Sequence, residues 1–285
     1  MVMPSKTIFL FILVCFITFI TIQANNNNNN NNFRWSSYSN IHETTPTSIF
    51  QINLKTLLSY LSSNATANKE FHNATVTDIN NSSNTVYGLF MCKGDVPAHL
   101  CSQCVTNATS YCDSESGCSL YKDMVIWYDM CMVRYSDKYF FSTLDLFSSS
   151  SSSCSAVDVS NQTISKRLVS ETLNEVADKA ANFSIGIKKY ATKEVIVSGL
   201  QNLYFQAQCT PDLSPQDCRK CLNESITQVL RNCNRDSNYV MTGDSKTSGC
   251  YIRYDVYPFY RSINAPTILE LDPASNTTNS NSIKK

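Results

Sequence analysis

The sequence has little of what catalytic and nucleic-acid-binding proteins usually require. It contains three histidines and seven glycines in 285 residues, and 23 acidic residues balance 23 basic ones. Because there is no net positive charge, nucleic acid is not an expected partner. The sequence also lacks Gly-x-Ser-x-Gly, His-Glu-x-x-His and a phosphate-binding glycine loop. We therefore expect a protein that is not an enzyme and uses no cofactor.

The few residues that suggest catalysis have simpler interpretations. His42, His72 and His99 lie in polar stretches of the first half, without counterparts in the second half. Isolated histidines of this kind are usually solvated. Glu171 and Glu175 lie four residues apart and so share one helical face, where solvent-exposed carboxylates are commoner than a glycosidase pair.

Long apolar runs are also scarce. Lys6 precedes the apolar run Ile8–Ile22, which predicts a signal peptide over residues 1–24. The run has 15 residues, whereas a membrane span needs roughly 20, so an uncleaved anchor is the less favoured alternative. No second apolar run follows, and we expect a secreted protein without a stable membrane anchor. Eight asparagines at residues 25–32 and the polar tail at residues 263–285 predict disordered segments.

Cysteine spacing repeats along the chain. The pattern Cys-x8-Cys-x2-Cys occurs twice, 117 residues apart, at Cys92, Cys101 and Cys104 and again at Cys209, Cys218 and Cys221. Downstream, Cys131-Met-Val-Arg134-Tyr135 matches Cys250-Tyr-Ile-Arg253-Tyr254. Such periodicity indicates a duplicated domain. We place the two copies at residues 33–147 and 154–262, joined by a flexible linker at 148–153 that contains six serines.

Hydrophobic periodicity indicates the same elements in both copies. Apolar residues with helical spacing occur at Phe50, Leu54, Leu57, Leu58 and Leu61, and again at Val169, Leu173, Val176, Ala177 and Ala180. Segments rich in β-branched and aromatic residues follow at 85–91, 124–135, 202–208 and 250–256, and a further helix is expected at 218–230. The predicted fold class is α+β: two tandem disulfide-stapled domains, each an antiparallel β-sheet with two helices packed on one face.

The remaining cysteines fit a disulfide framework. Removing Cys15 with the signal peptide leaves twelve, six in each half, and spacing alone does not choose among the 15 connectivities of six cysteines. Zinc requires four ligands and usually two Cys-x2-Cys pairs, whereas each half has one pair, so we expect no metal. Redox activity of Cys101-Ser-Gln-Cys104 or Cys218-Arg-Lys-Cys221 is disfavoured by the surrounding Cys-x8-Cys context.

Asn-x-Ser/Thr tripeptides are frequent, as expected of a secreted glycoprotein. We expect glycosylation among Asn64, Asn73, Asn81, Asn107, Asn161, Asn182, Asn223 and Asn276, while some of these tripeptides arise by chance in an Asn- and Ser-rich sequence.

The combined motifs resemble a known family. The two Cys-x8-Cys-x2-Cys patterns are followed by Trp127-Tyr128-Asp129-x-Cys131-x-x-Arg134-Tyr135 and by Cys250-x-x-Arg253-Tyr254. Over roughly Phe50 to Tyr260 the chain resembles plant cysteine-rich repeat secretory proteins with two stress-antifungal domains, homologous to ginkbilobin. Trp127, Tyr128 and Asp129 suggest a carbohydrate platform, although a strand beside a disulfide is more often core.

The resemblance also implies a disulfide pairing. When the family's pairing is transferred to this sequence, it gives Cys92–Cys101, Cys104–Cys131, Cys209–Cys218, Cys221–Cys250 and Cys154–Cys233. The first copy lacks the family's N-terminal cysteine and has an extra Cys112, so we infer a replacement bond, Cys112–Cys118.

The family's mannose site is altered in this sequence. Its Asn, Arg and Glu positions correspond to Ser155, Asp244 and Asp255 in the second copy, and the last two fall on Val125 and Ser136 in the first. Asp255 alone keeps the chemical type. We expect a non-enzymatic apoplastic binding or signalling protein of plant stress or defence responses. Its expected partner is cell-wall carbohydrate or an extracellular protein such as a receptor ectodomain, and the alternative is a mannose- or glucan-binding antifungal lectin.

Overall fold

The structure is a computed structural model. It describes residues 33–38, 48–78, 81–113, 121–145, 150–157, 166–197, 201–233 and 240–261. The expected signal peptide, the asparagine run and the C-terminal tail lie outside these residues, as do His42 and Cys118.

Each copy of the duplicated domain, hereafter a repeat, has the same order of elements. The first repeat consists, in chain order, of β1 (Phe33–Tyr38), α2 (Ser48–Thr66), β2 (Phe71–Asp78), β3 (Asn81–Cys92), α3 (Ala98–Asp113), β4 (Asp123–Tyr128) and β5 (Cys131–Ser136). The second consists of β6 (Ser150–Val157), α4 (Lys166–Ala181), β7 (Lys189–Val197), β8 (Gln201–Cys209), α5 (Pro215–Asn232), β9 (Val240–Thr247) and β10 (Cys250–Asp255). The order strand, helix, two strands, helix, two strands therefore occurs twice.

The strands of each repeat form one antiparallel sheet. The first sheet has the order β1-β4-β5-β3-β2 and the second has β6-β9-β10-β8-β7. Equivalent strands occupy equivalent positions, and the registers agree: Cys92 pairs with Cys131 as Cys209 pairs with Cys250. The duplication predicted from cysteine spacing is thus a duplication of sheet topology.

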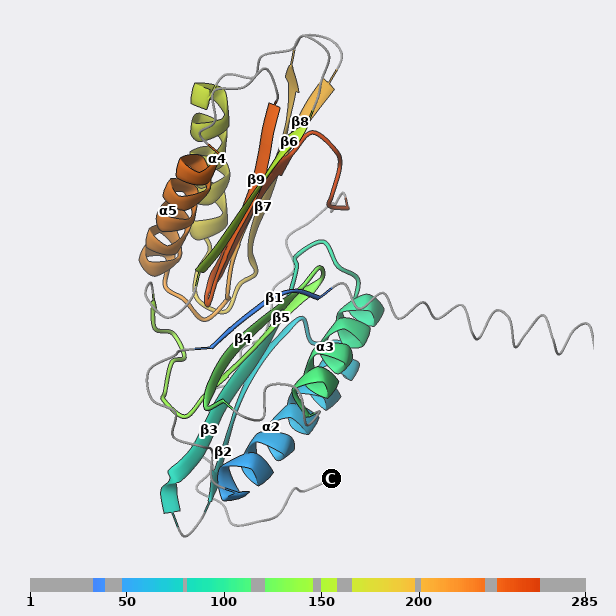
Figure 1. Ribbon diagram of the computed structural model, residues 1–285, viewed down its shortest axis with the longest axis vertical. Coiled ribbons are helices and arrows are strands. Elements are labelled where there is room, and N and C mark those ends of the chain that lie inside the picture. The colour runs from blue at the N-terminus through green and yellow to red at the C-terminus, as the bar shows by residue number, and fades with distance from the viewer. Residues whose placement is uncertain are drawn as a thin grey trace, which may run out of the picture. The chain divides into compact units, whose positions relative to one another are not determined.

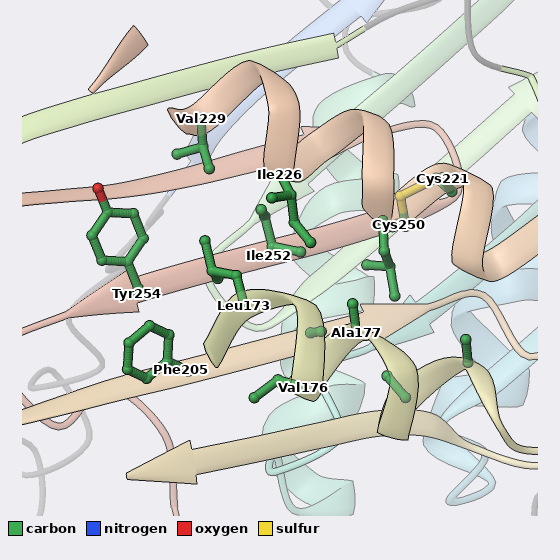
Figure 2. Packing of buried hydrophobic residues seen from close by; sticks show 14 of the residues in the cluster. Leu173, Val176, Ala177, Phe205, Cys221, Ile226, Val229, Cys250, Ile252 and Tyr254 are labelled. Carbon is green, nitrogen blue, oxygen red and sulfur yellow. A yellow bond between two sulfur atoms is a disulfide. The ribbon is translucent and has the colours of Figure 1, made fainter. Parts of the chain in front are cut away.

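Two helices cover one face of each sheet, as Figure 1 shows for α2 and α3 in the first repeat and α4 and α5 in the second. All ten apolar residues that predicted the helices before β2 and β7 are buried. In the second repeat, Leu173, Val176 and Ala177 of α4 face Phe205 and Ile252 of the sheet (Figure 2). The α+β prediction, with both helices on one face, is confirmed.

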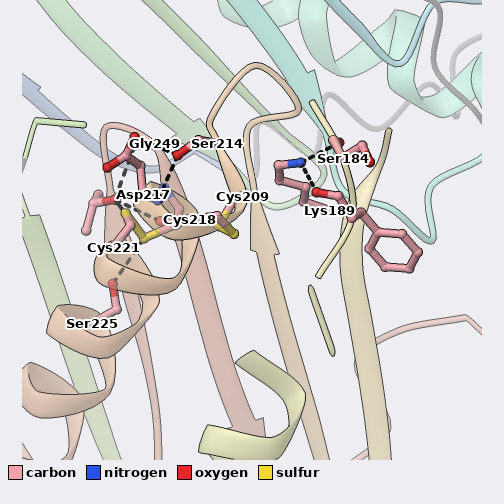
Figure 3. Close-up of a disulfide and its surroundings, with 12 residues drawn as sticks. Ser184, Lys189, Cys209, Ser214, Asp217, Cys218, Cys221, Ser225 and Gly249 are labelled. Carbon is pink, nitrogen blue, oxygen red and sulfur yellow. Dashed lines mark hydrogen bonds between the residues drawn. A yellow bond between two sulfur atoms is a disulfide. The ribbon is translucent and has the colours of Figure 1, made fainter. Parts of the chain in front are cut away.

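Helix α5 begins at a well-formed N-cap. The backbone N–H of Asp217 donates to Ser214 Oγ at 3.0 Å, and Pro215 lies in the first turn, where its missing N–H has no intrahelical role (Figure 3). The cap fixes the start of the helix next to Cys218 and Cys221.

Disulfides join each second helix to its sheet. The structure contains Cys92–Cys101, Cys104–Cys131, Cys154–Cys233, Cys209–Cys218 and Cys221–Cys250, which are five of the six expected bonds. Cys112 is also disulfide-bonded, to a partner outside the described residues. Its bond to Cys118 stays a prediction.

The expected serine linker is wrong for most of its length. Ser150–Ser153 form the first half of β6, which pairs with β9 from Ser150 opposite Thr247 to Val157 opposite Val240. Serine has little strand propensity, but the neighbouring β9 supplies hydrogen bonds, and Cys154 ties β6 to Cys233 at the end of α5. The second repeat therefore begins before Cys154.

His72 is a second correction. It lies in β2, opposite Phe90 of β3, and is buried with its ring centroid 5.5 Å from that of Tyr60. The polar stretch that suggested a solvated histidine is instead the edge strand β2 of the sheet. Among the described residues, no helix is long and apolar enough to cross a bilayer.

Candidate functional site

An apolar cluster joins the two repeats on the sheet faces that the helices leave uncovered. In β4, Ile126 packs toward the helices, whereas its neighbours Val125 and Trp127 belong to a cluster that also contains Tyr251 of β10. Such alternation is expected of a strand buried on both faces. Trp127 is fully buried, 5.6 Å from Tyr251 between ring centroids. It is core and not a carbohydrate platform, in agreement with the favoured interpretation.

Polar contacts fix the same junction. The indole N–H of Trp127 donates to the carbonyl of Thr247 at 2.9 Å. Buried Gln208 accepts a hydrogen bond from the N–H of Gly94 at 3.1 Å and donates to the carbonyl of Cys92 at 2.9 Å. These bonds satisfy backbone groups of each repeat with partners from the other. Both repeats accordingly belong to one compact unit of the chain, which begins at Phe33.

Gly94 is required by this close approach. A Cβ added there would lie 2.3 Å from Cγ of Tyr190, a residue of β7. No side chain fits at that distance, so the loop after β3 contacts the second sheet only because residue 94 is glycine.

A polar pocket of about 140 Å³ opens beside this junction. It is lined by Lys93 and Asp129 of the first repeat and by Ser153, Ser155, Thr242, Gly243, Asp244, Lys246, Tyr251, Arg253 and Asp255 of the second. Two loops of the first repeat, after β3 and after β4, thus face three strands of the second.

Strand alternation explains the chemistry of the pocket. Residues two apart in a strand share a face, so β10 directs Tyr251, Arg253 and Asp255 away from its helices. β9 contributes Thr242, Asp244 and Lys246 by the same rule, and β6 contributes Ser153 and Ser155. Lys93 is held in place because its backbone N–H donates to the carbonyl of Met130 at 2.9 Å.

Two carboxylates of the pocket are engaged by neighbours. Asp244 pairs with Lys246 and accepts from the hydroxyl of Ser153. Burial alone would raise the pKa of Asp244, but these partners outweigh it, and the pKa lies below its usual value. Asp255 accepts from Arg253 at 2.7 Å and from the N–H of Val256 at 2.8 Å. Both aspartates therefore already have hydrogen-bond donors within the protein.

Lys93 is held differently. Its side chain is 8% exposed, and its ammonium lies 4.3 Å from the centroid of the Tyr251 ring. Burial and, to a smaller extent, the charge of Lys246 together lower the pKa of Lys93 to about 8, against a weaker opposing effect of Asp129. Lys246 also lies 5.5 Å from the Tyr251 ring. Lys93 and Lys246 thus lie near the same ring, while Asp129 on this side of the pocket partly offsets the charge of Lys93.

The ligand-binding positions implied by the family resemblance have different surroundings in the two repeats. Ser155, Asp244 and Asp255 all line the pocket. In the first repeat, Val125 is part of the apolar junction and Ser136 is buried. The sequence thus located the second-repeat pocket in part, but it missed Lys93 and Lys246, whose positions depend on the contact between repeats.

The repeated Cys-x-x-Arg motif has a packing role. Arg134 lies 4.1 Å from the ring of Phe140, and Arg253 lies 4.3 Å from the ring of Phe259. Arg134 also pairs with Asp145 at 3.2 Å. Each arginine therefore stacks on an aromatic residue six positions later, and Arg253 additionally faces the pocket.

The other candidate residues lie apart from the pocket. Glu171 pairs with Arg167 at 2.7 Å and Glu175 with Lys179 at 2.9 Å, both on the exposed face of α4. His99 is exposed at the start of α3. Cys101 and Cys104 bond to different cysteines, and the same holds for Cys218 and Cys221, so neither pair forms an internal dithiol or disulfide. Within the described residues, no cluster of three His, Cys, Asp or Glu could hold a metal ion.

The expected glycosylation sites differ in accessibility. Asn107, Asn182 and Asn223 are exposed, whereas Asn64 and Asn73 are half-buried. The side chains of Asn81, Asn161 and Asn276 lie outside the described set. Modification at any of them stays a prediction.

Comparison with known proteins shows which family and which relatives this chain is similar to. Residues 35–138 and 151–257 each match the family described as Salt stress response/antifungal. The chain is 36% identical over 238 residues to cysteine-rich receptor-like protein kinase 25 of Arabidopsis thaliana, covering 81% of this chain and 33% of that protein. It is 35% identical to the putative cysteine-rich receptor-like protein kinase 9 of the same plant, covering 75% of this chain and 77% of that protein. The chain spans about a third of the length of the first of these relatives.

Solved structures have the same fold. The tandem DUF26 ectodomain of the Arabidopsis thaliana cysteine-rich receptor-like protein PDLP8 superposes with a TM-score of 0.58 at 23% identity, covering 79% of this chain and 98% of that one. The PDLP5 ectodomain gives 0.55 at 26% identity, covering 79% and 100%. Because the family model matches both repeats, over residues 35–138 and 151–257, this chain belongs to the Salt stress response/antifungal family.

Proposed function

We propose that this chain is a non-enzymatic extracellular binding protein of plant stress or defence signalling, and that the pocket between its repeats is its binding site. The observation that carries the proposal is the convergence of charged side chains from both repeats on one cavity. Lys93 is more than nine-tenths buried, and burying a charge is costly unless something compensates it. A ligand is the natural compensation for such an arrangement.

The extracellular setting is supported by several independent features. Five disulfides in the described residues suit an oxidising compartment. The apolar run at Ile8–Ile22 predicts a signal peptide. The matched relatives are receptor-like kinases and receptor-like ectodomains. Secretion into the apoplast is therefore part of the proposal, with cell-wall carbohydrate or an extracellular protein as the partner.

Two tryptophan variants test the pocket. Ser155 is exposed at the pocket rim, and Ala156, next to it in β6, is exposed on the opposite face of the strand. Disulfide-intact wild-type protein, Ser155→Trp and Ala156→Trp are compared on a plant cell-wall glycan array and in pull-downs from apoplastic fluid. We expect Ser155→Trp to abolish specific binding and Ala156→Trp to preserve it. Specific binding that survives Ser155→Trp would place the binding site elsewhere.

A mannose- or glucan-binding antifungal lectin is the second candidate, because Ser155, Asp244 and Asp255 line one pocket. Asp244 stands where the family resemblance implies an arginine, and both aspartates already have donors. We expect no sub-millimolar mannose affinity in calorimetry. Sub-millimolar binding that Asp255→Ala removes would favour the lectin.

A further inference from the structure

The pocket offers charged groups to a ligand but no open aromatic ring on which a sugar could stack. Tyr251 is the aromatic residue of the lining, and Trp127 lies 5.6 Å from its ring while Lys93 lies 4.3 Å from it. Neutral sugars are commonly held by stacking their apolar face on an open ring, and here contacts already occupy the ring. Recognition must therefore rest on charge and hydrogen bonds.

Three cations, Lys93, Lys246 and Arg253, and three carboxylates, Asp129, Asp244 and Asp255, line the pocket, so the pairing among them decides which ligand charge fits. Asp244 and Asp255 are each engaged by a cation and by a second donor. Lys93, by contrast, is buried with its ammonium 4.3 Å from the centroid of the Tyr251 ring, and Lys246 lowers its pKa by more than Asp129 raises it. A carboxylate placed at Lys93 would receive a charge-assisted hydrogen bond from its ammonium.

The rim of the pocket supplies neutral hydrogen-bonding groups. Ser155 is exposed on β6, and the hydroxyl of Thr242 on β9 donates to the Ser155 carbonyl at 3.4 Å. Hydroxyl groups donate and accept, so they suit the alcohols of a sugar ring. The size of the cavity, about 140 Å³, limits the buried part of a ligand to a single small unit.

We propose that this pocket binds a hydroxylated carboxylate, a hexuronic acid residue, with its carboxylate at Lys93 and its hydroxyls toward Ser155 and Thr242. This assignment rests on the proposed function and names the ligand class of the same site. The shared chemistry covers both a free hexuronate and the end of an acidic cell-wall polysaccharide, and the experiment separates these sources.

Calorimetric titration at pH 6.5 compares galacturonate with galactose, which has the same ring without the carboxylate, and with acetate, which lacks the hydroxyls. A short galacturonate oligomer is the fourth ligand. We expect galacturonate to bind at least about tenfold more tightly than either control. Tighter binding of the oligomer identifies a polymer end as the source, and equal binding identifies the free acid.

Substitutions in the pocket test which residues contact galacturonate. Lys93→Met keeps an unbranched side chain that is one heavy atom shorter and removes its charge, and it should weaken galacturonate binding about tenfold or more. Ser155→Trp should abolish binding, and Ala156→Trp should leave it unchanged. For wild-type protein, affinity should fall between pH 7 and pH 9.5, because Lys93 loses its proton near pH 8. Proper folding of each variant is checked by its unfolding transition.

Several results would overturn the proposal: no galacturonate binding at 10 mM, roughly the upper limit of weak recognition; equal binding of galactose; or unchanged binding after Lys93→Met. If galacturonate fails while Ser155→Trp still removes binding of another extracellular ligand, the ligand class is wrong and the proposed function stands. If Ser155→Trp has no effect on any ligand, the proposed function itself fails.

Discussion

Replacing Gln208 with leucine should loosen the two repeats from each other. Gln208 is 2% exposed and bridges the repeats through two hydrogen bonds, one from the N–H of Gly94 at 3.1 Å and one to the carbonyl of Cys92 at 2.9 Å. Leucine has similar bulk but makes neither bond. A buried N–H and a buried carbonyl of the first repeat would then lack partners.

The expected loss follows from these two groups. Each buried backbone group without a partner costs about 1–3 kcal/mol, so Gln208→Leu should destabilise the protein by about 2–6 kcal/mol. This is a large part of the roughly 5–15 kcal/mol that stabilises a typical domain. Because the lost contacts lie between repeats, the single unfolding transition expected of the wild type should shift or separate into two.

Urea unfolding and scanning calorimetry of the disulfide-intact protein measure both effects. Gln103→Leu is the matched control, since Gln103 is exposed on α3 within the first repeat. We expect the control to cost less than about 1 kcal/mol and to leave the number of transitions unchanged. If Gln208→Leu unfolds within about 0.5 kcal/mol of wild type, this contact does not hold the repeats together.

Three further perturbations follow from the same structure. Gly94→Ala places a Cβ 2.3 Å from Tyr190 and should cost about 1–3 kcal/mol in urea unfolding; an unchanged midpoint would contradict the close approach. Removing the Cys104–Cys131 bond, whose cysteines are 27 residues apart, by the double alanine variant should cost about 3.5 kcal/mol of unfolded-chain entropy, measured against wild type under non-reducing conditions. Lys93→Met should stabilise the protein at pH 7 by up to about 3 kcal/mol, because the pKa of Lys93 falls from 10.5 to about 8 on folding and its protonation favours the unfolded chain. That gain should shrink as pH rises from 8 to 10.5, and a gain that does not depend on pH would refute the assigned charge.

Local patterns in the sequence were sufficient to predict the core of each repeat. The helical stripes, such as Phe50 to Leu61, and the aromatic strands beside the cysteine motifs report burial within one repeat. Edge strands were harder to predict, because their pairing depends on a neighbour and not on their own composition. Ser150–Ser153 illustrates this: its serines have no strand pattern, yet β9 pairs with all four.

The pocket could be predicted only in part for a similar reason. Asp244 and Asp255 followed from the family resemblance, which implies ligand-binding positions at fixed distances from the last cysteine of the repeat. Lys93 follows the first cysteine of its motif and carries no periodic signal, and its place opposite Tyr251 depends on a contact between residues more than 150 positions apart. Side chains that become important only when two repeats meet cannot be read from either repeat alone.

The central claim is that one pocket built from both repeats binds the ligand. The most direct test is an NMR titration of the disulfide-intact, isotopically labelled protein with galacturonate. The claim predicts simultaneous amide shifts at Lys93 and Asp129 of the first repeat and at Ser155, Asp244 and Arg253 of the second, with one shared dissociation constant. Shifts confined to one repeat, or to the helical faces, would contradict it.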